Sequence, residues 1–89
     1  MKRTEEQAAA RRAARERKTR ETIKHYDTLP DSAFIRLPVV CAIRGGVSAA
    51  TIWRQCREGR LPAPQKLGPK ITAWNVGKMR AHAAAEAAA

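Results

Sequence analysis

Three positions of this sequence combine arginine with a small neighbour in a way that suits contact with a nucleic-acid base. Arg54 and Arg57 are three residues apart, and Ala50 lies four residues before Arg54. On a helix these three side chains share one face. A guanidinium can form two parallel hydrogen bonds with the O6/N7 edge of guanine, and alanine permits close approach. The pattern favours a helix that reads bases in the major groove of DNA. The alternative is an ordinary solvated arginine face.

The segment that carries these arginines has the signals of one short helix. Ser48 is a good N-cap, and no helix breaker follows until Gly59, so we expect a helix over about 48–58. Ile52 and Cys56 lie one turn apart and predict the buried face, with Ala49 beside them. This assignment directs the arginines outward.

Two further residues of this helix have side chains suited to contact with DNA. The hydroxyl groups of Ser48 and Thr51, at the helix N-terminus, are suited to bind a phosphate together with the backbone N–H groups there. Trp53 lies about 100° around the helix from Ile52. We expect it to close the edge of the core, and the alternative is contact with the DNA backbone.

The sequence gives little indication of a metal-binding site or of a catalytic nucleophile. His25 and His82 are far apart and have no cluster of cysteines or carboxylates beside them. Cys41 and Cys56 lack the paired spacing of a zinc site, and we interpret both as small buried hydrophobic residues. We therefore expect no metal, no cofactor and no catalytic activity.

The charge of the chain indicates a polyanionic partner. Its 89 residues carry 18 Lys and Arg against 8 Asp and Glu, a net charge of +10. Eighteen of the apolar residues are alanine, so the core must be small and a large enzyme cleft is not expected. There is no apolar run long enough for a membrane span or a secretion signal, which favours a cytoplasmic chain. Without a large cleft, no small-molecule ligand is expected. Double-stranded DNA is the simplest partner.

The N-terminal segment, residues 1–26, is rich in Arg and Ala and has almost no large apolar side chain. It is predicted to be either disordered or a solvated helix. Its functional interpretation is a basic arm along DNA phosphates, and the alternative is a tail that only adds solubility. The arm residues are Arg11, Arg12, Arg15, Arg17, Lys18 and Arg20. Residues 27–33 are turn formers and are expected to be a linker.

The folded domain is expected over residues 34–82. Phe34 to Leu37 is extended, and Pro38 suits the first turn of a helix that ends near Arg44, before Gly45 and Gly46. This helix, the turn and the helix over 48–58 predict a helix-turn-helix. Residues 83–89 are expected to be an alanine-rich helical extension with a frayed end.

A small β-hairpin is predicted after the second helix, over about 65–74, with its turn at Gly68-Pro69-Lys70. Leu67 and Trp74 are large enough to pin it to the helices. Asn75 is expected to cap a last helix that turns Val76 and Met79 inward. The fold class is therefore mainly α with a small hairpin, and the basic residues expected near DNA phosphates are Lys66, Lys70, Arg60 and Arg36.

The central part of the chain resembles the AlpA family of prophage transcriptional regulators, relatives of excisionases in the MerR-like winged-helix group. The resemblance depends on Arg36-Leu37-Pro38, on Ser48 with Thr51, on the run from Glu58 to Pro62, and on Leu67-Gly68-Pro69-Lys70 leading to Trp74. It implies a winged helix-turn-helix with the second helix in the major groove and the hairpin as the wing.

Two features depart from the family pattern. The turn from Arg44 to Val47 is one residue longer than usual, which can reorient the second helix. His82 stands where the last helix often carries an aromatic residue, which weakens the seal of the core.

The resemblance implies a mobile-element regulator that acts with RNA polymerase or a recombinase. A core this small reads a short site, so several copies on repeated sites are expected. The close alternative is an excisionase-like protein that bends DNA for a recombinase. A more remote alternative is an RNA-binding or protein-interaction module, although the sequence lacks the interleaved surface aromatics that stack on RNA bases.

Overall fold

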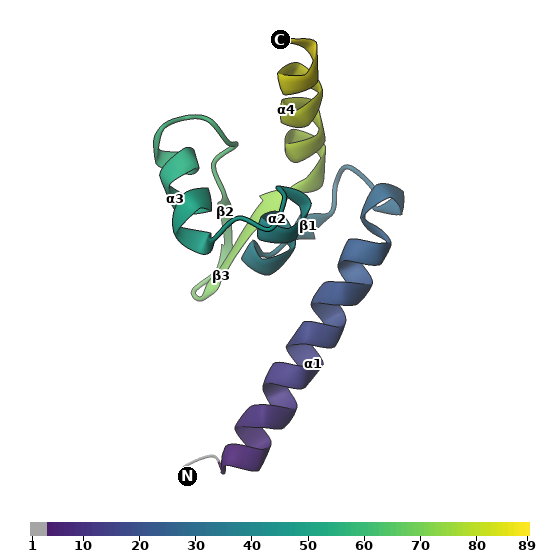
Figure 1. Ribbon diagram of the computed structural model, residues 1–89, viewed down its shortest axis with the longest axis vertical. Helices are drawn as coiled ribbons and strands as arrows, with labels where there is room; N and C mark the ends of the chain where they lie inside the picture. Colours follow the sequence, from purple (N-terminus) through teal and green to yellow (C-terminus); the bar gives the residue numbers. More distant parts are fainter. Residues whose placement is uncertain (1–3) are drawn as a thin grey trace.

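The computed structural model describes residues 4–89, which form four α-helices, a 3₁₀ turn and a three-stranded sheet (Figure 1). In chain order these are α1 (Glu5–Lys24), η1 (Tyr26–Thr28), β1 (Phe34–Ile35), α2 (Leu37–Ile43), α3 (Ala49–Arg57), β2 (Gln65–Gly68), β3 (Ile71–Asn75) and α4 (Val76–Ala88). The predicted order from residue 34 onward, strand, helix, turn, helix, hairpin and helix, is confirmed. The first three residues of the expected N-terminal tail lie outside the described residues.

The turn between α2 and α3 is made by two consecutive glycines in the left-handed region. Gly45 has φ 90° and Gly46 has φ 78°, a backbone conformation that favours glycine. The Gly46 N–H donates to the Cys41 carbonyl at 2.8 Å, which satisfies one of the last carbonyls of α2. The glycine pair therefore ends α2 and sets the direction in which α3 begins.

Both ends of α3 are capped as the sequence predicted. At its start the Ser48 hydroxyl accepts from the Thr51 backbone N–H at 3.2 Å. At its end Gly59 has φ 75°, and the Arg60 N–H returns to the Gln55 carbonyl at 2.8 Å. These caps fix the length of the helix that carries the arginine face.

The sheet is antiparallel with strand order β1-β3-β2. Ile35 pairs with Trp74, so the short first strand extends the hairpin into a three-stranded sheet. On the other side of β3, Lys66 pairs with Thr72, and the register shifts between Lys66 and Gly68. This irregularity lies next to the hairpin turn.

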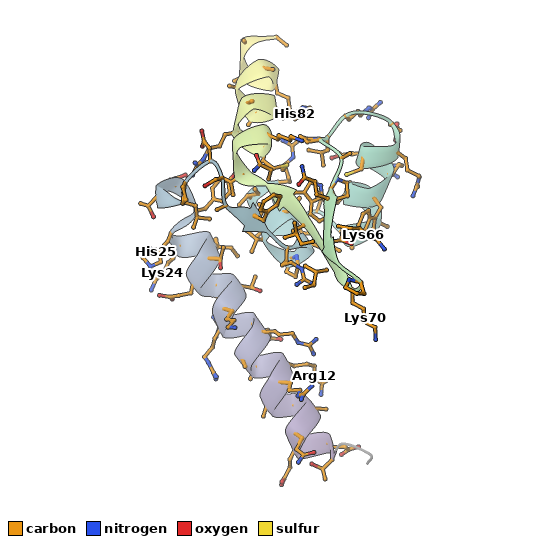
Figure 2. The ribbon with its side chains drawn as sticks, turned by 180° about the vertical axis from the view of Figure 1, so that it is seen from behind. Arg12, Lys24, His25, Lys66, Lys70 and His82 are labelled. Atoms are coloured by element: carbon orange, nitrogen blue, oxygen red, sulfur yellow. The ribbon has the colours of Figure 1, made fainter. Side chains whose placement is uncertain are left out.

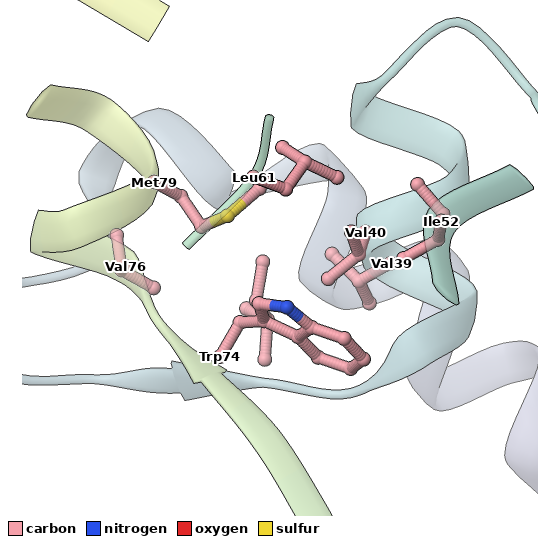
Figure 3. Close-up of a cluster of buried hydrophobic side chains, with 8 residues drawn as sticks. Val39, Val40, Ile52, Leu61, Trp74, Val76 and Met79 are labelled. Carbon is pink, nitrogen blue, oxygen red and sulfur yellow. The ribbon is translucent and has the colours of Figure 1, made fainter. Parts of the chain in front are cut away.

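The core forms around Trp74, which is fully buried (Figure 3). Ile35, Val40, Ile52 and Val76 are equally inaccessible, so every element from β1 to α4 except β2 contributes to the same cluster. Val76 and Met79 point inward from α4, as predicted. Asn75 caps this helix through its side-chain oxygen, which accepts from the Lys78 N–H at 2.9 Å.

Three predictions about packing are corrected by the structure. Leu67 is 49% exposed and does not pin the hairpin, because it lies within the register shift that interrupts the alternation of β2. Ala49 is exposed, not turned inward, at the first position of α3. Cys41 and Cys56 are half-buried at the periphery of the core, where Cys56 contacts the Pro62 carbonyl at 3.7 Å.

The packed region begins at Tyr26, whereas the sequence placed its start near Phe34. Tyr26, Leu29 and Ala33 pack against the core cluster. Arg80 of α4 donates to the Tyr26 carbonyl at 2.6 Å, and its guanidinium lies 5.3 Å from the centre of the Tyr26 ring. Residues 27–33, expected as a linker, therefore attach α1 to the body.

The α1 helix itself buries no residue, which matches the solvated helix among the two predicted alternatives. Thr4 and Gln7 form a capping box at its start. Beyond its contact with α2 the helix extends away from the body, while α4 extends in the opposite direction (Figure 1). Over residues 4–89 there is no helix with the length and apolar character needed to cross a membrane.

Candidate nucleic-acid interface

The outer face of α3 carries the side chains that the sequence singled out. Ala50, Arg54 and Arg57 are all exposed, while Ile52 on the opposite face is completely buried. The buried face anchors the helix to the core, and the caps at both ends hold its backbone. The two guanidinium groups are therefore presented to solvent from a fixed support.

Arg54 and Arg57 differ in their partners. The Nε atom of Arg54 lies 3.7 Å from Glu58 Oε1, and the other oxygen of Glu58 lies 3.7 Å from Arg60 Nε. Among residues 4–89 Arg57 has no ion pair. Long, exposed ion pairs of this kind are worth about 0–1 kcal/mol, so Arg54 and Arg60 can leave Glu58 for a stronger acceptor. The four-residue spacing of Arg54 and Glu58 is a local signal for this pair, whereas the contact of Glu58 with Arg60 has no such helical spacing.

The two hydroxyl groups at the N-terminus of α3 are partly occupied. Ser48 Oγ and Thr51 Oγ1 lie 3.0 Å apart, and Ser48 Oγ also accepts the Thr51 backbone N–H. Ser48 is exposed and Thr51 is half-buried. Their first role in this structure is to cap the helix, and Ser48 is the more accessible of the two to a phosphate.

Two basic residues of the compact region have structural roles instead. Arg44, at the C-terminal end of α2, forms two hydrogen bonds with Glu86 of α4, at 2.6 and 3.0 Å. These bonds raise the pKa of Arg44 and lower the pKa of Glu86. Arg80 is held by Asp31 at 2.7 Å and by Tyr26. The basic side chains left for a partner are therefore fewer than the sequence suggested.

The hairpin adds exposed lysines beside α3. Lys66 and Lys70 are both exposed, and Lys70 projects from the hairpin tip (Figure 2). Arg36, also exposed, lies at the N-cap of α2. Trp53 packs against Trp74, with ring centres 5.3 Å apart and an angle of 45° between the planes. Trp53 thus closes the edge of the core, as predicted, yet remains 36% exposed.

A groove of about 560 Å³ lies between α1, the start of α2, the flank of α3 and the hairpin. Its lining brings together four cationic side chains from three parts of the chain: Arg15, Lys18, Arg36 and Lys70. The floor includes Trp53, Trp74 and Thr72. Of the six expected arm residues, Arg15 and Lys18 line this groove, whereas Arg11, Arg12, Arg17 and Arg20 do not.

The position of α1 opposite the hairpin across this groove was not predicted from the sequence. The available signal was weak: Thr19, Thr22 and Tyr26 recur at helical spacing and are half-buried. Threonines at this spacing do not distinguish a docked helix from a free one. The contacts that accompany this placement, of α1 with α2 and of Arg80 with Tyr26, join different elements of the chain.

The histidines remain separate in space as well as in sequence. His25 lies 3.5 Å from Glu21 on α1, and His82 lies 3.7 Å from Glu86 on α4 (Figure 2). Within residues 4–89 there is no cluster of His, Cys, Asp and Glu that can hold a metal ion. His82 is half-buried, and its buried Nε2 atom has no hydrogen-bond partner in the described part of the chain.

Comparison with protein-family models, with curated proteins and with solved structures found no match for this chain. The resemblance to the AlpA family accordingly stays a prediction, and a functional assignment depends on the geometry described above.

Proposed function

We propose that this chain is a sequence-specific double-stranded DNA-binding protein with a winged helix-turn-helix, in which α3 enters the major groove and the β2–β3 hairpin is the wing. The observation that carries the proposal is the outer face of α3. Arg54 and Arg57 flank the small Ala50 there, on a helix that is capped at both ends and anchored by the buried Ile52.

The shape of the molecule fits this role. The major groove of B-DNA is about 12 Å wide and admits one α-helix. The hairpin stands beside α3 with exposed lysines, and phosphate contacts from such an element fix the register of a helix on the duplex. Glu58 is the one acidic side chain between Phe34 and Arg80, against nine basic ones, and seven of these remain after Arg44 and Arg80 are paired with Glu86 and Asp31. This surface supports binding to a polyanion.

The biological setting follows from the AlpA resemblance as part of the same proposal. We place the protein in the bacterial cytoplasm as a regulator of transcription from a prophage or a similar element. A site read by one α3 is short, so useful specificity requires several copies on repeated sites.

The test begins with selection of preferred sequences from a random duplex library, followed by titration of the full chain with the selected duplex. Arg54→Gln and Arg57→Gln are each expected to weaken binding by about 1–3 kcal/mol and to relax the preference at one base pair. Lys78→Gln is the matched control, because it removes one exposed charge from α4 and is expected to preserve the preference.

Two results would contradict the proposal. One is a selection that returns no preferred sequence. The other is tighter binding of the wild-type chain to RNA or single-stranded DNA than to the duplex at equal salt, which would support the nucleic-acid alternative.

A further inference from the structure

The groove between α1 and the hairpin is lined by cations that are not neutralised within the fold. Arg15, Lys18, Arg36 and Lys70 line it, and no carboxylate does. None of these four side chains forms an ion pair within the part of the chain that the structure describes. Like charges around one groove repel each other, and a polyanion that enters the groove relieves this repulsion.

The far wall of the groove is held in place. The α1 helix contacts α2, and just after α1 the Tyr26 carbonyl in η1 accepts a hydrogen bond from Arg80 of α4. Asp31 accepts a second hydrogen bond from the same guanidinium. In Figure 1 the hairpin and the N-terminal half of α1 extend in the same direction from α2. The basic side chains of α1 therefore face those of the hairpin across a defined space.

The groove borders α3 through Trp53, which lies next to the outer face of that helix. Trp53, which lines the groove, lies on the helix between the buried side of Ile52 and the outward side of Arg57. A ligand bound to the α3 face thus reaches the groove without crossing an acidic residue in its lining.

We propose that this groove holds one strand of the DNA phosphate backbone on the hairpin side of the bound site, with α1 as its outer wall. The inference rests on the proposed binding of DNA by α3. Each strand of a duplex carries a negative charge about every 3.4 Å, so a strand that crosses the groove meets cations from α1, α2 and the hairpin in succession. The Arg15 side of α1 is then a specific part of the interface, and its opposite side is not.

The decisive comparison uses two double variants of the full chain with equal charge. Arg15→Gln with Lys18→Gln removes two groove cations, while Arg17→Gln with Lys24→Gln removes two cations from the other side of α1. Both pairs are exposed and leave the core intact. Binding of a mixed-sequence DNA duplex is measured at several salt concentrations for wild type and both variants.

The expected result is a difference in salt dependence. Each lost phosphate contact reduces the magnitude of the slope of log affinity against log salt by about 0.9. For the variant with Arg15→Gln and Lys18→Gln, the magnitude of this slope is expected to be about 1.8 smaller than for wild type. The control variant is expected to retain the wild-type slope. Equal slopes for the two double variants would overturn the proposal.

Trp53 provides a second readout. Its half-exposed ring lines the groove, so its fluorescence is expected to change when duplex DNA binds, and Trp53→Phe separates this signal from that of the fully buried Trp74, which borders the same groove. The change is expected to disappear in Trp53→Phe. An unchanged Trp53 signal at saturation with the duplex would also contradict occupation of the groove.

These outcomes separate the groove from the proposed function. If the wild type shows a sequence preference and the two double variants have equal salt slopes, recognition by α3 is supported and the proposed DNA contact in the groove is rejected. If the salt slopes differ but the wild type shows no sequence preference, the DNA contact in the groove is supported and sequence-specific binding is rejected. A wild-type chain that binds no duplex overturns both.

Discussion

The arginines of this chain have distinct roles that their positions in the fold decide. Arg44 and Arg80 bind carboxylates and a carbonyl across different elements, at 2.6–3.0 Å. Arg54 and Arg60 share one exposed carboxylate at a longer distance, and Arg57 extends into solvent. The helical spacing predicted the outward direction of Arg54 and Arg57. It did not predict that Arg44 and Arg80 serve the fold, because their partners are distant in sequence.

The ion pair between Arg44 and Glu86 predicts a specific pH dependence. Hydrogen bonds from Arg44 hold the pKa of Glu86 below its ordinary value in the folded chain. The stabilisation is therefore present at neutral pH, and it is lost as the pH falls through the lowered pKa and the carboxylate is protonated. We expect Glu86→Gln to reduce the thermal midpoint at neutral pH and to have little effect in acid.

The measurement is thermal unfolding of wild type and Glu86→Gln over a series of pH values. Because Glu86 is exposed on α4, the difference at neutral pH is expected to be modest and to shrink at high salt. Lys78→Gln on the same helix controls for a general effect of charge. A difference that persists unchanged at acid pH would contradict the assignment.

At the scale of elements, the sequence predicts helix and turn boundaries well where they depend on neighbouring residues. Ser48, Gly59 and Asn75 each begin or end a helix as expected, and Pro38 lies in the first turn of α2, because capping depends on neighbouring residues alone. Leu67 was misassigned because the register shift in β2 depends on pairing with β3. Likewise, the docking of α1 depends on Tyr26 meeting Arg80, and no local pattern contains that information.

The turn before α3 requires a glycine conformation at Gly46. Gly46 has φ 78°, and a Cβ atom added there meets nothing within 4 Å. The cost of a side chain is therefore conformational, about 1–2 kcal/mol for a residue without a local hydrogen bond in the left-handed region. We expect Gly46→Ala to lower the free energy of unfolding by this amount and Gly46→Asn to lower it less, because asparagine tolerates this conformation.

Urea unfolding of the two variants beside wild type tests this expectation. The comparison is informative because both substitutions add a side chain at the same position and differ in their preference for positive φ. If Ala and Asn cost the same, space or solvation would explain the effect, and the role of the glycine conformation would be wrong.

At the scale of the whole molecule, the net charge of +10 divides into charges that hold the fold together and charges that face outward. The two strongest pairs join α4 to α2 and to the segment after α1. The remaining cations concentrate on α1, α3, the hairpin and the start of α2. The sequence placed the positive charge correctly in two regions, but only the fold shows that α1 and the hairpin share one groove.

We expect the position of α1 relative to the body to depend on Arg80, which binds Asp31 and Tyr26 in the segment after α1. Arg80→Met removes the hydrogen bonds to Asp31 and to the Tyr26 carbonyl while it preserves much of the side-chain volume. Loss of charge-assisted hydrogen bonds costs about 1.5–3 kcal/mol each at buried sites and less where water replaces the donor, as the exposed Asp31 allows. We expect the C-terminal turn of α1 to detach, with faster amide hydrogen exchange around Tyr26 and unchanged exchange in α3, which has its own caps. Lys78→Met on the same helix is the control and should leave exchange near Tyr26 unchanged. Equal exchange near Tyr26 in the two variants would show that the contact of α1 with α2 positions the helix without Arg80.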